Sequence, residues 1–150
     1  MTTRILVVCL GNICRSPMGQ GVIEKRAAEA GLAVEVDSAG LGSWHIGNPP
    51  NPRGLKVAAA RGYDNARQRA RQVRADDFHG FDLILGMDAS NIEGLAHLRP
   101  DGALAEIRLF HPTGQDIPDP YYGGLPDYEH ALDLIEEAAD TLIRELAQRA

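Results

Sequence analysis

The feature that most constrains this chain is an apolar run that ends in a short loop and leads into a helical pattern. Residues 4–10, RILVVCL, form a nearly continuous β-branched and apolar segment of strand length. Ser16 and Pro17 then give a helix-start signal, with Ser16 as N-cap and Pro17 at the first helical position. A loop between a strand and a helix directs several backbone N–H groups at one spot. The segment therefore predicts an anion-binding loop.

The residues of this loop favour phosphate chemistry. Gly11 and Asn12 are the residue types that most readily adopt a positive φ. Cys9 ends the strand and Arg15 follows with C-x5-R spacing, so the planar guanidinium can grip two oxygens of a tetrahedral oxyanion. The cation, the N–H groups and the helix N-terminus favour the thiolate form of Cys9, and Ser16 can donate a hydrogen bond to the sulfur. A nucleophile in a phosphate-shaped cup predicts a phosphocysteine intermediate.

The cysteine content leaves two questions about these thiols. A single cysteine is most often a small buried hydrophobe, but the joint pattern with Arg15 favours a site at Cys9. Cys9 and Cys14 are the only cysteines, too few for a disulfide framework or a zinc site. Two interpretations of Cys14 stay open: a packed apolar side chain, or a partner that blocks Cys9 reversibly as a disulfide.

Length and charge narrow the class of protein. We expect one domain, residues 1–150, which is long enough to bury a substantial core. The net charge of −6 argues against a general binder of nucleic acid or anionic membranes. The arginine-rich segment 65–74 is interpreted as a solvated face rather than a collar for acidic phosphoproteins. The N-terminal apolar run is too short for a signal peptide and no segment could span a bilayer, so we expect a cytoplasmic protein.

Strand and helix patterns alternate along the chain. We expect strands at residues 4–10, 32–36, 81–87 and 105–110, and helices at 18–30, 52–61, 91–98 and 126–148. This alternation predicts an α/β, three-layer domain with a four-stranded parallel sheet flanked by helices and the phosphate-binding loop after the first strand. The last helix carries an apolar stripe that we expect to cover the core: Leu132, Ile135, Ala139, Leu142, Ile143 and Leu146.

Two further segments are expected near the loop. The Gly- and Pro-rich stretch 41–52 carries Trp44, which is either a wall of a substrate pocket or a core residue; the polar loop favours the pocket rim. His45 is expected on the surface or behind the site, since no metal ligand stands beside it. Ser38, in the turn that closes the second strand, is either a hydrogen-bond partner of Asn12 or an ordinary turn serine.

The segment 117–124, IPDPYYGG, supplies a candidate general acid. Prolines on both sides of Asp119 restrict its backbone. Asp119 is expected close to a thiolate and a phosphate dianion, and these negative charges favour the protonated form of its carboxyl group. Asp119 can then donate a proton to the leaving oxygen. Tyr121 and Tyr122 can sandwich an aromatic leaving group, with Trp44 opposite. Alone the segment is typical of a turn, but beside C-x5-R-S it provides the missing acid.

The phrases VCLGNICRSPM, DSAG, SWHIG, ARQV, GMDASN and DPYYGG occur in this order along the whole chain, which therefore resembles the low-molecular-weight protein tyrosine phosphatases. The resemblance implies that Cys9 is the nucleophile, that Arg15 binds phosphate and stabilises the transition state, and that Asp119 acts as acid and then as base. It implies no metal and no cofactor. The substrate- and phosphate-binding residues that it implies are Leu10, Gly11, Asn12, Ile13, Cys14, Ser16, Trp44, Tyr121 and Tyr122.

One position departs from the family pattern. Many members have a histidine two residues before the ARQ phrase, where this chain has Gln68, so we expect the polar network around Asn12 and Ser38 to be built differently.

The resemblance also implies partners. It implies a phosphotyrosine-containing protein as partner, together with a cognate tyrosine kinase. We expect neither nucleic-acid binding nor membrane insertion, and we expect the protein to be a monomer or a weak dimer.

Three alternatives to phosphotyrosine hydrolysis have less support in this sequence. Arsenate reductases with a related cup relay electrons through further cysteines, and this chain has none after Cys14. Phosphoarginine phosphatases on the same scaffold typically carry threonine in place of Ile13 and lack the second tyrosine, so this sequence favours an aromatic phosphoester. A phosphotyrosine-binding pseudophosphatase would usually have lost Cys9 or Asp119, and both are present.

Overall fold

A computed structural model of the protein describes residues 2–149 and shows a parallel sheet of four strands in the order β2-β1-β3-β4. The strands are β1 (Thr3–Cys9), β2 (Val34–Gly40), β3 (Leu83–Gly86) and β4 (Glu106–Leu109). The helices are α1 (Arg15–Glu29), α2 (Pro52–Ala60), α3 (Asp77–Gly80), α4 (Ala89–Leu98) and α5 (Leu125–Arg149). All three strand pairings are parallel, so the predicted α/β architecture is confirmed.

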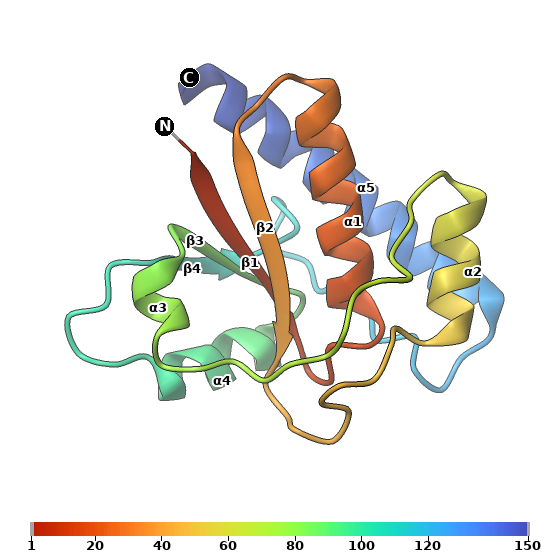
Figure 1. Ribbon diagram of the computed structural model, residues 1–150, viewed down its shortest axis with the longest axis horizontal. Coiled ribbons are helices and arrows are strands. Elements are labelled where there is room, and N and C mark those ends of the chain that lie inside the picture. The colour runs from red at the N-terminus through yellow and green to blue at the C-terminus, as the bar shows by residue number, and fades with distance from the viewer. Residues whose placement is uncertain (1, 150) are drawn as a thin grey trace.

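The sheet separates two apolar clusters, which makes the fold three-layered. Helices α1, α2 and α5 cover one face, and α3 and α4 cover the other (Figure 1). Along the central strand β1, Ile5 and Val7 point into the first cluster, whereas Leu6 and Val8 point into the second. Burial on both faces explains why the sequence of β1 is almost continuously apolar. No helix among the described residues is long and apolar enough to cross a membrane.

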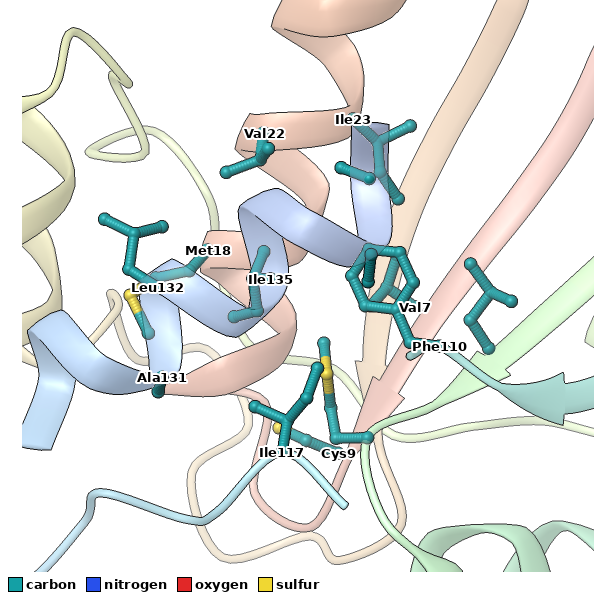
Figure 2. Close-up of a cluster of buried hydrophobic side chains, with 14 of the residues drawn as sticks. Val7, Cys9, Met18, Val22, Ile23, Phe110, Ile117, Ala131, Leu132 and Ile135 are labelled. Atoms are coloured by element: carbon teal, nitrogen blue, oxygen red, sulfur yellow. The ribbon is translucent and has the colours of Figure 1, made fainter. Parts of the chain in front are cut away.

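The apolar stripe of α5 packs over α1 and beneath the phosphate-binding loop. Figure 2 shows Met18 and Val22 of α1 beside Leu132 and Ile135 of α5, in the same cluster as Cys9. All these side chains are buried, which confirms that the stripe faces the core; its member Ile143 is half-buried. The side chain of Cys9 therefore belongs to a closely packed apolar cluster together with side chains of α1 and α5.

The predicted cap of α1 is wrong. The helix begins at Arg15, one residue before Ser16, and its N-cap residue Cys14 makes no side-chain cap hydrogen bond. The Ser16 hydroxyl instead approaches the sulfur of Cys9. The side-chain oxygen of a capping serine accepts a hydrogen bond from a backbone N–H of the first helical turn. Ser16 does not cap the helix in this way, because its hydroxyl contacts the loop residue Cys9 instead. At the other end, Gly31 follows the helix with a φ of 69°, as a helix terminator does.

The second strand also differs from its expected range. Strand β2 begins at Val34 and continues through Asp37-Ser38-Ala39-Gly40, where the sequence suggested a turn. These residues pair in parallel register with β1, and Cys9 lies opposite Gly40. A Cβ atom on Gly40 would lie 3.0 Å from backbone atoms of the loop, so the small residues allow β2 to approach it closely. Helix α3 was not expected, because four residues are too few to show helical periodicity.

A core substitution tests the packing that supports the loop. Ile135→Ala removes buried methyl and methylene groups of α5 and should lower the free energy of unfolding by about 2–5 kcal/mol. Leu104 is 93% exposed, so Leu104→Ala is a matched control that should change it by less than about 0.5 kcal/mol. Urea denaturation measures both values. Similar losses for the two variants would contradict the described core.

Candidate active site

The loop after β1 is held in its curved conformation by the side chain of Asn12. This residue has a φ of 57°, which is uncommon for any residue other than glycine. Its Nδ2 donates to Ser16 Oγ at 2.7 Å and to Ser38 Oγ at 3.0 Å, and its Oδ1 accepts from the backbone N–H of Arg71 at 3.0 Å. These bonds offset the backbone strain. Ser38 is thus a partner of Asn12, not a turn serine.

The sulfur of Cys9 is surrounded by hydrogen-bond donors. Its Sγ lies 3.0 Å from Ser16 Oγ and accepts from the backbone N–H of Asn12 at 3.3 Å. Because Ser16 Oγ already accepts from Asn12, its own hydrogen is left to point at the sulfur. Hydrogen bonds of this kind favour the negatively charged form of the acceptor. The arrangement therefore suits a thiolate.

The guanidinium of Arg15 is buried below the loop and oriented by Asp88. One nitrogen, Nη1, donates to Asp88 Oδ2 at 2.6 Å and to the carbonyl oxygen of Ile117 at 2.9 Å. Burial raises the pKa of Asp88, but hydrogen bonds from Arg15, Ser90 and the backbone of Asn91 outweigh it and hold the pKa below its usual value. An ionised Asp88 fixes the buried cation, while Nε of Arg15 has no hydrogen-bond partner among residues 2–149.

Asp88 is a site residue that the sequence analysis missed. Its place shortly before the helix expected at residues 91–98 is typical of a helix cap, and it does cap α4, accepting from Asn91 N at 2.8 Å. Its other oxygen, Oδ2, binds Arg15, so one carboxylate joins a helix terminus to the site. The signal in the sequence is its position just after β3, because the carboxyl ends of parallel strands meet at one edge of the sheet.

Asp119 lies at the mouth of the same region. Its side chain is 40% exposed, with Oδ2 3.6 Å from Arg15 Nη2. Its Oδ1 accepts from the backbone N–H of Tyr121 at 3.1 Å, which fixes the carboxyl group to its own loop. The rings of Tyr121 and Tyr122 are 4.8 Å apart and nearly perpendicular. The segment thus presents one carboxyl group and two aromatic faces together.

A cavity of about 400 Å³ joins the loop to the aromatic residues. It is lined by Cys9, Leu10, Gly11, Ile13, Cys14, Trp44, His45, Asp119, Tyr121 and Tyr122. Trp44 is 69% exposed and lies at the rim, so its interpretation as a core residue is wrong. His45 lines the cavity directly, closer to the site than expected, because its ring packs over Gly11, which has no side chain. The remaining predicted site residues, Asn12, Arg15 and Ser16, are buried and do not line the cavity.

The polar support behind Asn12 does not use Gln68. Ser38 Oγ donates to Gln20 Oε1 at 2.8 Å, which extends the network into α1. Gln68 Nε2 instead donates to the carbonyl oxygen of Pro17 at 3.1 Å. The network is therefore built through Gln20. No pattern in the sequence points to this role of Gln20, because a glutamine in a helix is usually exposed.

Cys14 is a second buried thiol with a different environment. Its sulfur lies 3.4 Å from the hydroxyl of Tyr128. Burial raises the pKa of Cys14 to about 12, although the hydrogen bond with Tyr128 acts in the opposite direction. Cys9 and Cys14 are both free cysteines. Cys14 therefore stays a neutral thiol at neutral pH.

These features define a class of enzyme. The cavity holds a thiol with donors directed at it and a carboxyl group, and a buried guanidinium lies 3.6 Å from that carboxyl group. A cysteine-dependent phosphomonoesterase needs these groups for nucleophilic attack, charge stabilisation and proton transfer. No group of three metal-ligating side chains suited to hold an ion occurs within the part of the chain that the structure describes.

Comparisons with known proteins place the chain in a family. A family model described as "Low molecular weight phosphotyrosine protein phosphatase" matches residues 4–150. A low molecular weight protein-tyrosine-phosphatase from Streptomyces coelicolor is 41% identical, over 95% of this chain and 93% of its own. A protein tyrosine phosphatase structure from Entamoeba histolytica is similar with a TM-score of 0.92 at 35% identity, over 97% of each chain. A drosophila arginine phosphatase structure gives a TM-score of 0.89 at 30% identity, over 95% and 96% of the two chains.

The chain belongs to the low molecular weight phosphotyrosine protein phosphatase family. It is a cysteine-dependent phosphatase, and phosphotyrosine hydrolysis is the activity of this family.

Chemical labelling tests the contrast between the two thiols. In a Cys9→Ser variant, native Cys14 should resist iodoacetamide at about pH 8, because burial leaves almost none of it as thiolate. In guanidinium chloride the same thiol should react rapidly, since an unperturbed cysteine has a pKa of about 8.5. Mass spectrometry of the labelled protein follows both reactions. Equal rates in the native and unfolded protein would contradict the burial of Cys14.

Proposed function

We propose that Cys9, Arg15 and Asp119 carry out phosphotyrosine hydrolysis in this protein through a phosphocysteine intermediate. The observation that carries the proposal is the position of the Cys9 sulfur. It lies at the cavity with two donors directed at it, Ser16 Oγ at 3.0 Å and the N–H of Asn12 at 3.3 Å. The only carboxyl group among the residues that line this cavity is Asp119. A nucleophile and a proton donor thus share one space.

In the first step, the Cys9 thiolate attacks phosphorus in line with the tyrosyl oxygen. The S–P bond forms as the P–O bond to the tyrosyl group breaks, and Asp119 gives its proton to the departing oxygen. Arg15 and the backbone N–H groups of the loop stabilise the charge on the equatorial phosphate oxygens. Nε of Arg15, which has no partner among the described residues, is available for this contact.

In the second step, water replaces the cysteine. Asp119, now a carboxylate, takes a proton from water as the oxygen bonds to phosphorus. The S–P bond breaks and its electron pair returns to Cys9 as the thiolate, while inorganic phosphate is released. The Ser16 hydroxyl beside the sulfur stabilises this leaving group. The same residue thus serves as acid and then as base, and the enzyme returns to its starting state.

The cavity wall supports an aromatic phosphoester as substrate. The fold is shared with an arginine phosphatase, so the choice between phosphotyrosine and phosphoarginine depends on the lining residues. Ile13 offers no acceptor for the N–H groups of a guanidinium leaving group. Trp44 and the tyrosine pair offer aromatic faces to a phenyl ring. Arsenate reduction finds no support, because no cysteine beyond Cys14 could relay electrons.

The biological setting follows from the same site. We infer a phosphotyrosine-containing protein as partner, with a cognate tyrosine kinase as the source of its phosphoryl group.

The compartment that suits the site is the cytoplasm. A nucleophile that must remain a free thiol needs surroundings in which thiols stay reduced, as they do in the cytoplasm. The net charge of −6 disfavours nucleic acid as partner, and neither membrane insertion nor more than a monomer or weak dimer is needed for the chemistry.

Peptide hydrolysis tests the proposed reaction. The protein, with a chelator present, should release phosphate from a phosphotyrosine peptide and at most weakly from the matched phosphoarginine peptide. Cys9→Ser should abolish turnover, since the serine hydroxyl has no comparable nucleophilicity in this site, while circular dichroism shows an intact fold. Substantial turnover by Cys9→Ser would refute the nucleophile, and preference for phosphoarginine would refute the substrate.

The leaving group tests Asp119. Asp119→Ala should reduce turnover of phenyl phosphate by about 10²–10⁴-fold, because its leaving oxygen needs a proton. The loss for p-nitrophenyl phosphate should be smaller, since p-nitrophenolate leaves without protonation. Steady-state kinetics with a series of substituted phenyl phosphates measures the difference. Equal losses across the series would count against Asp119 as the general acid.

A further inference from the structure

We propose that Arg71 is a positioning residue for the nucleophile, through an ionic clasp formed by Arg71, Asp37 and Asp77. The proposal rests on the proposed function, because it concerns how the Cys9 thiolate is stabilised. Arg71 lies outside the cavity, and within residues 2–149 its side chain donates to Asp37, Asp77 and the carbonyl oxygen of Gln72, none of which lines the cavity. Its effect must therefore reach the sulfur through other groups.

The clasp fixes the Arg71 side chain from two elements. Nη1 and Nη2 donate to the two oxygens of Asp77, at 3.0 and 3.1 Å, in a bidentate pair. Nε donates to Asp37 Oδ2 at 3.0 Å. Asp77 is 4% exposed and opens α3, and Asp37 belongs to β2. The arginine was expected on a solvated face, but the structure places it half-buried between two carboxylates.

The backbone of Arg71 connects the clasp to the phosphate-binding loop. Its N–H donates to Asn12 Oδ1 at 3.0 Å, and its carbonyl oxygen accepts from Gly40 N at 2.8 Å. Asp37 is also the residue before Ser38, which accepts from Nδ2 of the Asn12 amide. The clasp thus holds two of the three groups that bind this amide, Ser38 and the N–H of Arg71, and Ser16 is the third. The surrounding segment, residues 61–76, contains neither a helix nor one of the four strands, so it depends on such contacts for its position.

The orientation of the Asn12 amide decides where the Ser16 hydrogen points. As placed, Nδ2 donates to Ser16, and the single hydroxyl hydrogen of Ser16 remains for the sulfur of Cys9. If the amide turned over, Oδ1 would face Ser16 and take that hydrogen, and the sulfur would lose a donor. The N–H of Arg71 prevents this, because it needs an acceptor at the Oδ1 position. Arg71 thereby selects the arrangement that stabilises the thiolate.

A matched set of variants separates this role from general stability. Arg71→Gln and Asp77→Asn break the clasp, and Arg71→Lys keeps a cation but loses the bidentate geometry. Arg61→Gln is the control, because Arg61 is buried to a similar degree and pairs with Asp133 and Glu136 of α5, outside the network of Asn12. Each is assayed with p-nitrophenyl phosphate at a temperature where circular dichroism shows it fully folded.

We expect kcat to fall about tenfold in Arg71→Gln and Asp77→Asn, and less in Arg71→Lys, since the loss concerns a positioned donor. KM and the Kd of inorganic phosphate should stay within about threefold of wild type, because the phosphate contacts remain. Alkylation of Cys9 by iodoacetate at about pH 6 should slow in parallel with kcat. Cys14 should remain unlabelled, which shows that the variants have not opened. Arg61→Gln should match wild type in every assay.

Three results would overturn the proposal. They are wild-type kcat and alkylation rates in both Arg71→Gln and Asp77→Asn, an equal loss of kcat in Arg61→Gln, or a change confined to KM. A failure of the proposed function gives a different result, because it would appear as turnover by Cys9→Ser in the same assay. The two hypotheses are therefore tested separately.

Discussion

The structure of the site depends on the amide of Asn12 in the loop between β1 and α1. A φ of 57° at a residue with a side chain is unfavourable, and three hydrogen bonds hold it there. They reach α1 through Ser16, β2 through Ser38 and the irregular segment through Arg71. The loop can curve around a phosphate only while these elements stay in place. The apolar clusters on both faces of the sheet provide that rigidity, since they fix β1 between β2 and β3.

Electrostatic compensation is the second constraint. A fully buried guanidinium is costly unless its charge and its N–H groups are matched. Asp88 and the carbonyl oxygen of Ile117 satisfy one nitrogen of Arg15, and the hydrogen bonds to Asp88 keep that carboxylate ionised. The cation is thereby positioned before any substrate arrives, which is the condition for effective stabilisation of a transition state. Cys14 shows the contrast: burial raises its pKa more than the hydrogen bond with Tyr128 and the charge of Arg15 lower it, so it stays a neutral thiol.

The sequence predicts the fold and the local part of the site well, but not the groups that tertiary structure adds. Residues 9–16 are contiguous, and a strand, loop and helix in that order bring them together by local geometry alone. Asp119 and the tyrosine pair were detectable because prolines and glycines mark their loop. By contrast, Asp88 carries the pattern of an ordinary helix cap, and Arg71 that of a solvated charge. Their roles arise from contacts across 73 and 59 positions of the chain, which no local pattern records. The prediction of Ser16 as the N-cap of α1 is wrong for a related reason. Local propensity favours serine at a helix N-cap, but in the folded protein the Ser16 hydroxyl contacts Cys9.

The central claim is that a phosphoryl group passes through the sulfur of Cys9. Rapid acid quenching during turnover of p-nitrophenyl phosphate, followed by proteolysis and mass spectrometry, tests it directly. We expect one added phosphoryl mass on the peptide that contains Cys9, formed within the first turnover and absent from Cys9→Ser. A phosphoryl group on any other residue, or steady turnover without a labelled Cys9 peptide under quench conditions that preserve a synthetic phosphocysteine standard, would contradict it.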